Sequence, residues 1–242
     1  MGASQAFSVT GPGCLDRFDG MHAATDQPAL VSIAVGDAPQ VWERLGFVVA
    51  DGATVVGGVR IDLGSEGHGV RSWTFSGIDA GPIVDGRLDG LRTTVVDAIG
   101  TTAISPDHPN GIVSIDHVVV ATPDHTRTLA ALSATGLELR RDDVHHVDTY
   151  GTPVMQAFYR PCGAILEIIG PEDAAPDAGK AGFYGLAFTS EDLEATAAYL
   201  GAALKPAKDA VQPGRRIATV ASSAGATVPI AIMSRHPRAD SL

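Results

Sequence analysis

One histidine and one glutamate stand in apolar runs, where a polar side chain needs a partner. His117 lies in IVSIDHVVVAT and Glu167 lies in AILEIIGP. Imidazole and carboxylate together suit a divalent metal ion such as Zn, Fe, Mn, Ni or Co. A catalytic metal site has about three protein ligands and one open position. The pair also has a metal-free interpretation, in which Glu167 accepts a proton from His117 or from a bound ligand. Both interpretations stay open at this point.

A third metal ligand has several candidates elsewhere in the chain. Gln156 and Gln212 offer amide oxygens, and His145 or His146 offers a second imidazole. The two histidines are adjacent in the polar stretch RRDDVHHVDTYGT, and adjacent residues of an extended chain point to opposite sides. At most one of them therefore faces a shared site. We favour a solvated loop for this stretch, because loops collect polar residues.

The elements that must position His117 and Glu167 occur twice. Residues 112–171 and residues 181–234 each read as a strand, a helix and further strands, and in each copy a Thr and an Asp precede the helix. Such internal repeats decide the architecture of a fold. Strict alternation places His117 on one face of its strand with Val119 and Ala121, and Glu167 likewise shares a face with its alternate neighbours. A fainter third copy covers about 28–78.

Composition excludes several classes of function. The formal net charge is −11, and nucleic acids and anionic membranes are bound by basic surfaces, so we expect neither as a partner. We expect a cytoplasmic protein, because no apolar run is long enough to span a membrane and the N-terminus lacks the pattern of a secretory signal. Cys14 and Cys162 are too few for a disulfide framework, and Cys162 is expected to be a free thiol.

The division into domains follows from these copies and from two stretches rich in Gly, Pro and Asp. We predict an arm at 1–26, a degenerate N-terminal module of strand, helix and strands at 27–90, a linker at 91–111 that contains one β-prone piece, and a two-copy domain at 112–236. A second flexible stretch, 171–182, joins the two better copies.

The βαβββ order, its tandem use and the pair IDHVVV…ILEIIGP resemble the vicinal oxygen chelate superfamily, which includes glyoxalase I, bleomycin-resistance-type proteins and extradiol dioxygenases. The resemblance implies an α+β fold in which tandem modules form one cup-shaped mixed sheet, with an extra degenerate N-terminal module. It also implies a divalent metal in the cup, and it places His117 and Glu167 at ligand positions. In the second copy, Tyr184 or Gly185 corresponds to His117 and Ala231 corresponds to Glu167, so that copy lacks both ligands.

Other residues are expected around the cup. Tyr184 either offers a phenol as an acid or fills the cup. Gln156 and Phe158 alternate with neighbours that face the other way, and sequence leaves open which set faces the cup. Gln212 and Arg216 would clamp an anion or carbonyl at the mouth.

Two functions follow from the resemblance. One is a metal-dependent lyase, isomerase or dioxygenase that acts on a small molecule with vicinal oxygens, with Zn, Ni, Fe or Mn as the ion and Glu167 as the base. The alternative is a metal-free protein that binds a small molecule, as bleomycin-resistance proteins do. An odd number of modules leaves one without an internal mate, so we also expect a homodimer.

Overall fold

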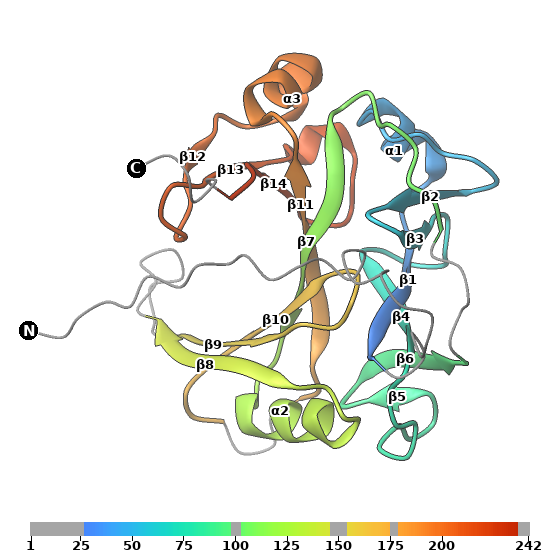
Figure 1. The fold of residues 1–242 in the computed structure, drawn as a ribbon, viewed down its shortest axis with the longest axis vertical. Coiled ribbons are helices and arrows are strands. Elements are labelled where there is room, and N and C mark those ends of the chain that lie inside the picture. Colours follow the sequence, from blue (N-terminus) through green and yellow to red (C-terminus); the bar gives the residue numbers. More distant parts are fainter. Residues whose placement is uncertain (1–26, 98–102, 146–153, 175–178, 237–242) are drawn as a thin grey trace, which may run out of the picture.

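The computed structural model describes residues 27–97, 103–145, 154–174 and 179–236, which form two mixed β-sheets with few helices (Figure 1). The larger sheet has eight strands in the order β12-β13-β14-β11-β7-β10-β9-β8. The α+β architecture of tandem copies is therefore confirmed. No helix in these four ranges is long and apolar enough to cross a membrane.

The two predicted copies form the two halves of the eight-stranded sheet. The first half consists of β7 (Ile112–Ala121), α2 (His125–Ala134), β8 (Leu139–His145), β9 (Val154–Tyr159) and β10 (Ile165–Gly170). The second half consists of β11 (Gly182–Ser190), α3 (Leu193–Leu200), β12 (Lys208–Asp209), β13 (Arg216–Thr219) and β14 (Ile230–Met233), with short 3₁₀ turns at Gly201–Ala203 and Ser222–Ala224. The halves join through the antiparallel pair β7–β11.

The same turn chemistry starts the helix in each half. The side chains of Asp124 and Asp192 accept hydrogen bonds from backbone N–H groups in the first turns of α2 and α3, which satisfies donors that have no partner within the helix. Behind each cap, the hydroxyl of Thr128 or Thr196 bonds the hydroxyl at the end of the preceding strand, at 2.6 Å in both halves. The sequence repeat is thus a repeat of contacts.

The smaller sheet contains β1 (Ala29–Val35), β2 (Ala53–Val56), β3 (Val59–Asp62), β4 (Val70–Ser76), β5 (Arg87–Leu88) and β6 (Leu91–Val96), with the helix α1 (Pro39–Arg44) after β1. Its order, β2-β3-β1-β4-β6-β5, matches that of the inner six strands of the larger sheet. In both sheets the central pair is antiparallel, and each central strand has a parallel neighbour on its other side.

The smaller sheet is therefore itself a reduced pair of copies, whose second member, β4 to β6, lacks a helix. The predicted module ended at residue 90, whereas the β-prone piece of the predicted linker forms β6 and continues this sheet. The argument for a homodimer from an odd number of modules consequently loses its premise.

The end of the predicted linker is docked against the smaller sheet. His108 Nδ1 accepts a hydrogen bond from the Val48 backbone N–H, and His108 Nε2 lies 3.0 Å from the Val55 carbonyl. Burial is the main cause that lowers the pKa of His108, so the ring is neutral and Nε2 carries its proton. Asn110 donates to the Leu45 carbonyl at 2.8 Å.

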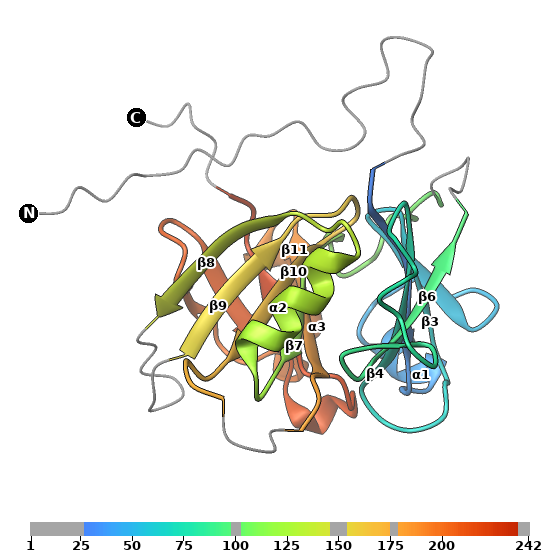
Figure 2. The ribbon, with the colours of Figure 1, turned by 90° about the horizontal axis from the view of Figure 1, so that it is seen from below.

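Aromatic side chains fill the space between the two sheets, which lie side by side in Figure 2. Trp42 of α1 packs against Phe47 and against Phe188 of β11, with ring centroids 4.8 and 6.0 Å apart. Trp73 of β4 meets Phe183 of β11 edge-on at 4.9 Å. One apolar core therefore spans both sheets, and helices α2 and α3 cover other parts of the larger one.

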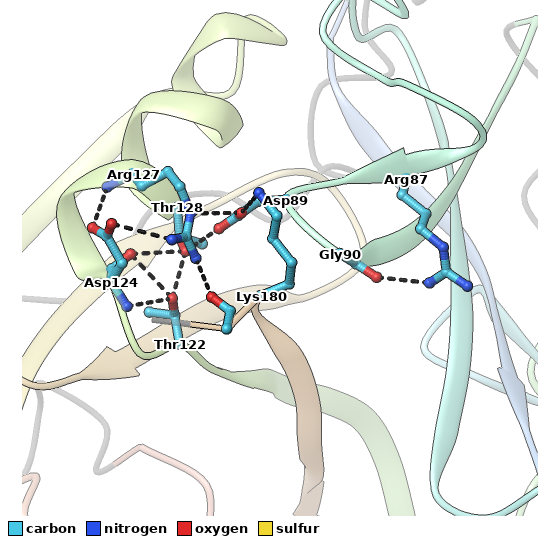
Figure 3. A network of polar contacts seen from close by, with 9 residues as sticks. Arg87, Asp89, Gly90, Thr122, Asp124, Arg127, Thr128 and Lys180 are labelled. Carbon is cyan, nitrogen blue, oxygen red and sulfur yellow. Dashed lines mark hydrogen bonds and ion pairs between the residues drawn. The ribbon is translucent and has the colours of Figure 1, made fainter. Parts of the chain in front are cut away.

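A polar network on Asp89 also ties the smaller sheet to α2 (Figure 3). The Asp89 side chain, 3% exposed, accepts hydrogen bonds from Arg127 Nε at 2.7 Å and from Thr128 Oγ1 at 2.6 Å, and it lies 3.4 Å from Lys180 Nζ. The Asp89 carbonyl also accepts from the Ala181 N–H. This network connects the β5–β6 turn to the start of the second half.

Two local expectations are wrong. The stretch predicted as a solvated loop forms the edge strand β8, which pairs with β9 up to His145; His146 lies outside the described residues. A polar edge strand lacks the apolar alternation that identifies a strand in sequence. Cys162, expected as a free thiol, is disulfide-bonded.

Candidate functional site

The two residues singled out first meet on the same face of neighbouring strands. Because β7 and β10 are parallel and His117 lies opposite Ile165, Glu167 is two residues further along β10 on the same face. His117 Nε2 lies 3.2 Å from Glu167 Oε2, and the two side chains are 17% and 13% exposed. The sequence-predicted pair is therefore formed, and both side chains are partly exposed.

A β-bulge adds Asp116, which sequence reasoning missed. Along β7 and β11, His117 lies opposite Ala187 while Ile115 lies opposite Phe188, so Asp116 is an extra residue in the ladder. Strict alternation would send Asp116 to the opposite face from His117, but an extra residue re-aims the side chains around it. Asp116 Oδ1 lies 2.9 Å from His117 Nδ1. The only sequence signal was an acid within an apolar strand.

Asp116 also anchors a buried arginine. Arg215 Nη2 donates to Asp116 Oδ2 at 2.5 Å, and the Thr189 hydroxyl donates to the same oxygen at 2.8 Å. The Arg215 side chain is 1% exposed, and its other donors reach the Gln212 side chain, the Ser234 carbonyl and His236 Nε2. A buried ion pair of this kind is stable only because hydrogen bonds satisfy both partners.

Hydrogen bonds and neighbouring charges shift the pKa values of Asp116 and His117. Burial alone would raise the pKa of Asp116, but hydrogen bonds from His117 and Arg215 hold it far below its usual range. Burial alone would lower the pKa of His117, but the bond to Asp116 and the negative charges of Glu167 and Asp116 raise it, against the opposing charge of Arg215. Without a metal, these contacts favour the protonated form of His117, which lies between two carboxylates.

Two further predicted residues share this face. Gln156 Nε2 donates to Glu167 Oε1 at 2.8 Å, and Phe158 lies opposite Glu167 across the β9–β10 ladder. Tyr159 instead turns to the helix side, where its hydroxyl donates to the Leu129 carbonyl of α2 at 3.0 Å. The set with Gln156 and Phe158 thus faces the cup, which resolves the alternative that sequence left open.

Other predicted residues lie elsewhere. Arg216 pairs with Glu194 of α3 and donates to the Ala207 carbonyl, so it is on the helix side, away from His117. Gln212 is engaged by Arg215 at 2.7 Å rather than by the metal pair. Tyr184 is 48% exposed and is itself an extra residue in the β7–β11 ladder, between Phe183 and Gly185. The structure does not bring these side chains to the His117–Glu167 pair.

The second half provides no equivalent pair. Thr122 and Ser190 occupy matching positions before the two helices, and His117 and Gly185 each lie five residues before them. His117 therefore corresponds to Gly185. The strand pairings in the two halves then match Glu167 of β10 to Ala231 of β14. A Cβ at residue 185 would lie 2.6 Å from the Pro229 carbonyl oxygen, so the backbone excludes any side chain there. The correspondence predicted from sequence holds.

The donor set fits a divalent ion with few protein ligands. Ligand atoms lie about 2.0–2.2 Å from a Zn²⁺ ion, so two neighbouring ligands of one ion are about 3 Å apart, as His117 Nε2 and Glu167 Oε2 are. Asp116 on the other ring nitrogen is the partner that metal-binding histidines commonly have. Among the described residues, no group of three His, Cys, Asp or Glu side chains could hold an ion. Gln156, whose amide bonds Glu167 at 2.8 Å, is the candidate for a third ligand.

Comparison with known proteins places the fold. No family model and no curated protein matches the sequence. A triple mutant of 4-hydroxymandelate synthase from Streptomyces coelicolor is similar in structure, with a TM-score of 0.57, 16% identity, and coverage of 86% of this chain and 92% of that one. At this identity the likeness shows the fold alone, and it agrees with the tandem-module architecture expected from the sequence.

Two epimerases match a shorter stretch. Methylmalonyl-CoA epimerase from Mycobacterium tuberculosis has 20% identity and a TM-score of 0.42, and the match covers 53% of this chain and 91% of that one. A variant of the Streptomyces coelicolor enzyme, in complex with 2-nitronate-propionyl-CoA, has 20% identity and a TM-score of 0.40, with 52% and 99% of the chains covered.

Proposed function

We propose that the cup holds a divalent metal ion between His117 and Glu167, and that the protein is a metal-dependent enzyme of the lyase, isomerase or oxygenase kind. The observation that carries this proposal is the 3.2 Å separation of His117 Nε2 and Glu167 Oε2, with Asp116 bonded to the opposite ring nitrogen. An ion bound there would act as a Lewis acid on vicinal oxygens of a small substrate.

The chain's own residues prepare this site. Asp116 holds the proton of His117 at Nδ1, so that the lone pair of Nε2 is directed at the ion. Arg215 neutralises Asp116, which otherwise would be a second buried negative charge beside Glu167. Gln156 orients the Glu167 carboxylate through Oε1 and leaves Oε2 for the ion or for a substrate proton. Phe158 supplies an apolar wall for the substrate on the same face.

Elemental analysis of protein purified without an affinity tag or chelator tests this proposal, together with calorimetric titration of zinc, nickel, manganese and iron(II). We expect near-stoichiometric binding of at least one of these ions, and its loss in His117→Ala and in Glu167→Ala. His68→Ala is the matched control, because His68 is an exposed histidine in the connection between β3 and β4 of the smaller sheet. Equal binding in His117→Ala would refute the assignment.

A second candidate is a metal-free cup that binds a small molecule. It is favoured by Gly185 and Ala231, which leave one half of the face without ligands. Wild-type protein that takes up no ion even at excess would favour it. The roles of Tyr184 as an acid and of Arg216 as an anion clamp stay predictions. The homodimer also stays a prediction, and light scattering would test it. The predicted cytoplasmic location also stays a prediction.

A further inference from the structure

A basic cleft lies at the junction of the two sheets, outside the cup. It has a volume of about 300 Å³ and is lined by three arginines, Arg71, Arg87 and Arg92, together with the start of β11 at Phe183. At the start of β11, Phe183 lies opposite Val120 of β7. Asp116 lies further along the same ladder, next to His117, which is opposite Ala187. The cleft and the metal pair are thus at different points of the β7–β11 ladder.

Among the residues that the structure describes, no acid pairs with the three arginines of the cleft. Arg71 donates to the His68 carbonyl at 3.3 Å and Arg87 donates to the Gly90 carbonyl at 2.9 Å, while Arg92 has no side-chain partner among the described residues. Carbonyl groups orient a guanidinium without cancelling its charge. Asp89, which lies between Arg87 and Arg92 in the sequence, is bonded instead to Arg127 and Thr128 (Figure 3).

All three arginines are exposed, and two of them face each other. Arg87 and Arg92 lie directly opposite each other on β5 and β6, and like charges at such positions repel. The chain as a whole carries a net charge of −11, so a cluster of three arginines contrasts with its overall negative charge. An anion in the cleft would offset this repulsion, because guanidinium groups bind carboxylate and phosphate oxygens in pairs.

The cleft also has an apolar side. Val70 and Leu91 are buried beneath it, and Phe183 is held edge-on by Trp73 at 4.9 Å. A volume near 300 Å³ is at the lower end of small-molecule sites. We propose that this cleft binds a small organic anion, a phosphate ester or a carboxylate, with its oxygens among Arg71, Arg87 and Arg92 and its apolar part against Phe183.

Calorimetric titration of the full chain with phenyl phosphate, benzoate and inorganic phosphate tests the proposal. We expect saturable binding of phenyl phosphate or benzoate, whichever has the favoured oxygen geometry, and weaker binding of inorganic phosphate, which cannot use Phe183. Affinity should fall about tenfold in Arg87→Gln and in Arg92→Gln, as expected for the loss of a charged hydrogen bond. It should also fall with added salt.

Arg60→Gln is the matched control, because Arg60 is an exposed arginine of the same sheet that pairs with Asp62 at 2.6 Å outside the cleft. An unchanged affinity in this variant supports a specific site. Equal weakening in Arg60→Gln, or no saturable binding of any of the three probes, overturns the proposal. Because the cup residues remain intact in these variants, loss of anion binding with normal metal uptake separates this site from the proposed function.

Discussion

In the first half of the eight-stranded sheet, β7 and β10 present a histidine and a glutamate to the cup; in the second half, β11 and β14 present Gly185 and Ala231 at the corresponding positions. The helix caps and the hydroxyl pairs behind them are nonetheless the same in both halves. Shared contacts thus preserve the fold, while the cup face is free to differ. The second half contributes Arg215 instead, which reaches across to Asp116 of the first.

The largest expected effect is a difference in the free energy of unfolding between variants of two adjacent arginines of the second half. Arg215→Met would leave Asp116 buried without its main counter-charge, and breaking a buried pair costs about 3–5 kcal/mol. Arg216→Met removes a partly exposed pair with Glu194, and such pairs contribute about 0–1 kcal/mol. Urea denaturation of both variants measures the free energies of unfolding. Similar losses would mean that Arg215 does not link the two halves.

A smaller effect concerns the empty ligand position. Gly185→Ala would force a Cβ to within 2.6 Å of the Pro229 carbonyl oxygen, and such overpacking costs about 1–3 kcal/mol. Gly182→Ala on the same strand meets nothing within 4 Å and serves as the control. Thermal unfolding should show a lower Tm for the first variant only. A stable Gly185→Ala protein would mean that the second half could have carried a ligand.

The smallest effect is the pH dependence of metal binding by the first half. Asp116 and Glu167 raise the pKa of His117, while Arg215 opposes them, so the proton competes with the ion at pH values above the ordinary histidine range. Metal affinity should therefore fall as the pH is lowered through the pKa of His117, by up to about tenfold per pH unit. Titrations from pH 6 to 9 measure this slope. An affinity independent of pH would exclude His117 as a ligand.

In the metal-free protein, protonation of His117 stabilises the fold rather than opposing a bound ion. Because the folded pKa of His117 is raised, its contribution to stability is present at low pH and is lost as the pH rises through that value. The pKa of His108 is lowered, so its contribution is present above the ordinary histidine pKa and is lost as the pH falls.

Much of the architecture was predictable because it depends on local patterns. The repeat of strand, cap and helix identified both halves of the larger sheet, and alternation placed His117 and Glu167 on matching faces. The smaller sheet was recognised only in part, because β5 has two residues and its half lacks a helix. Strand β8 was missed because its sequence is polar at the sheet edge.

The amino-acid sequence by itself determined the repeat, the helix starts, the metal-type pair and the half that lacks it, since each is a property of residues close in the chain or at a fixed period. Only the tertiary structure decided the roles of Asp116 and Arg215. A bulge breaks the alternation at Asp116, and a single strand's sequence does not reveal which of two adjacent arginines faces inward. Register between distant strands determines both, because burial of the intervening apolar faces selects one pairing over all others.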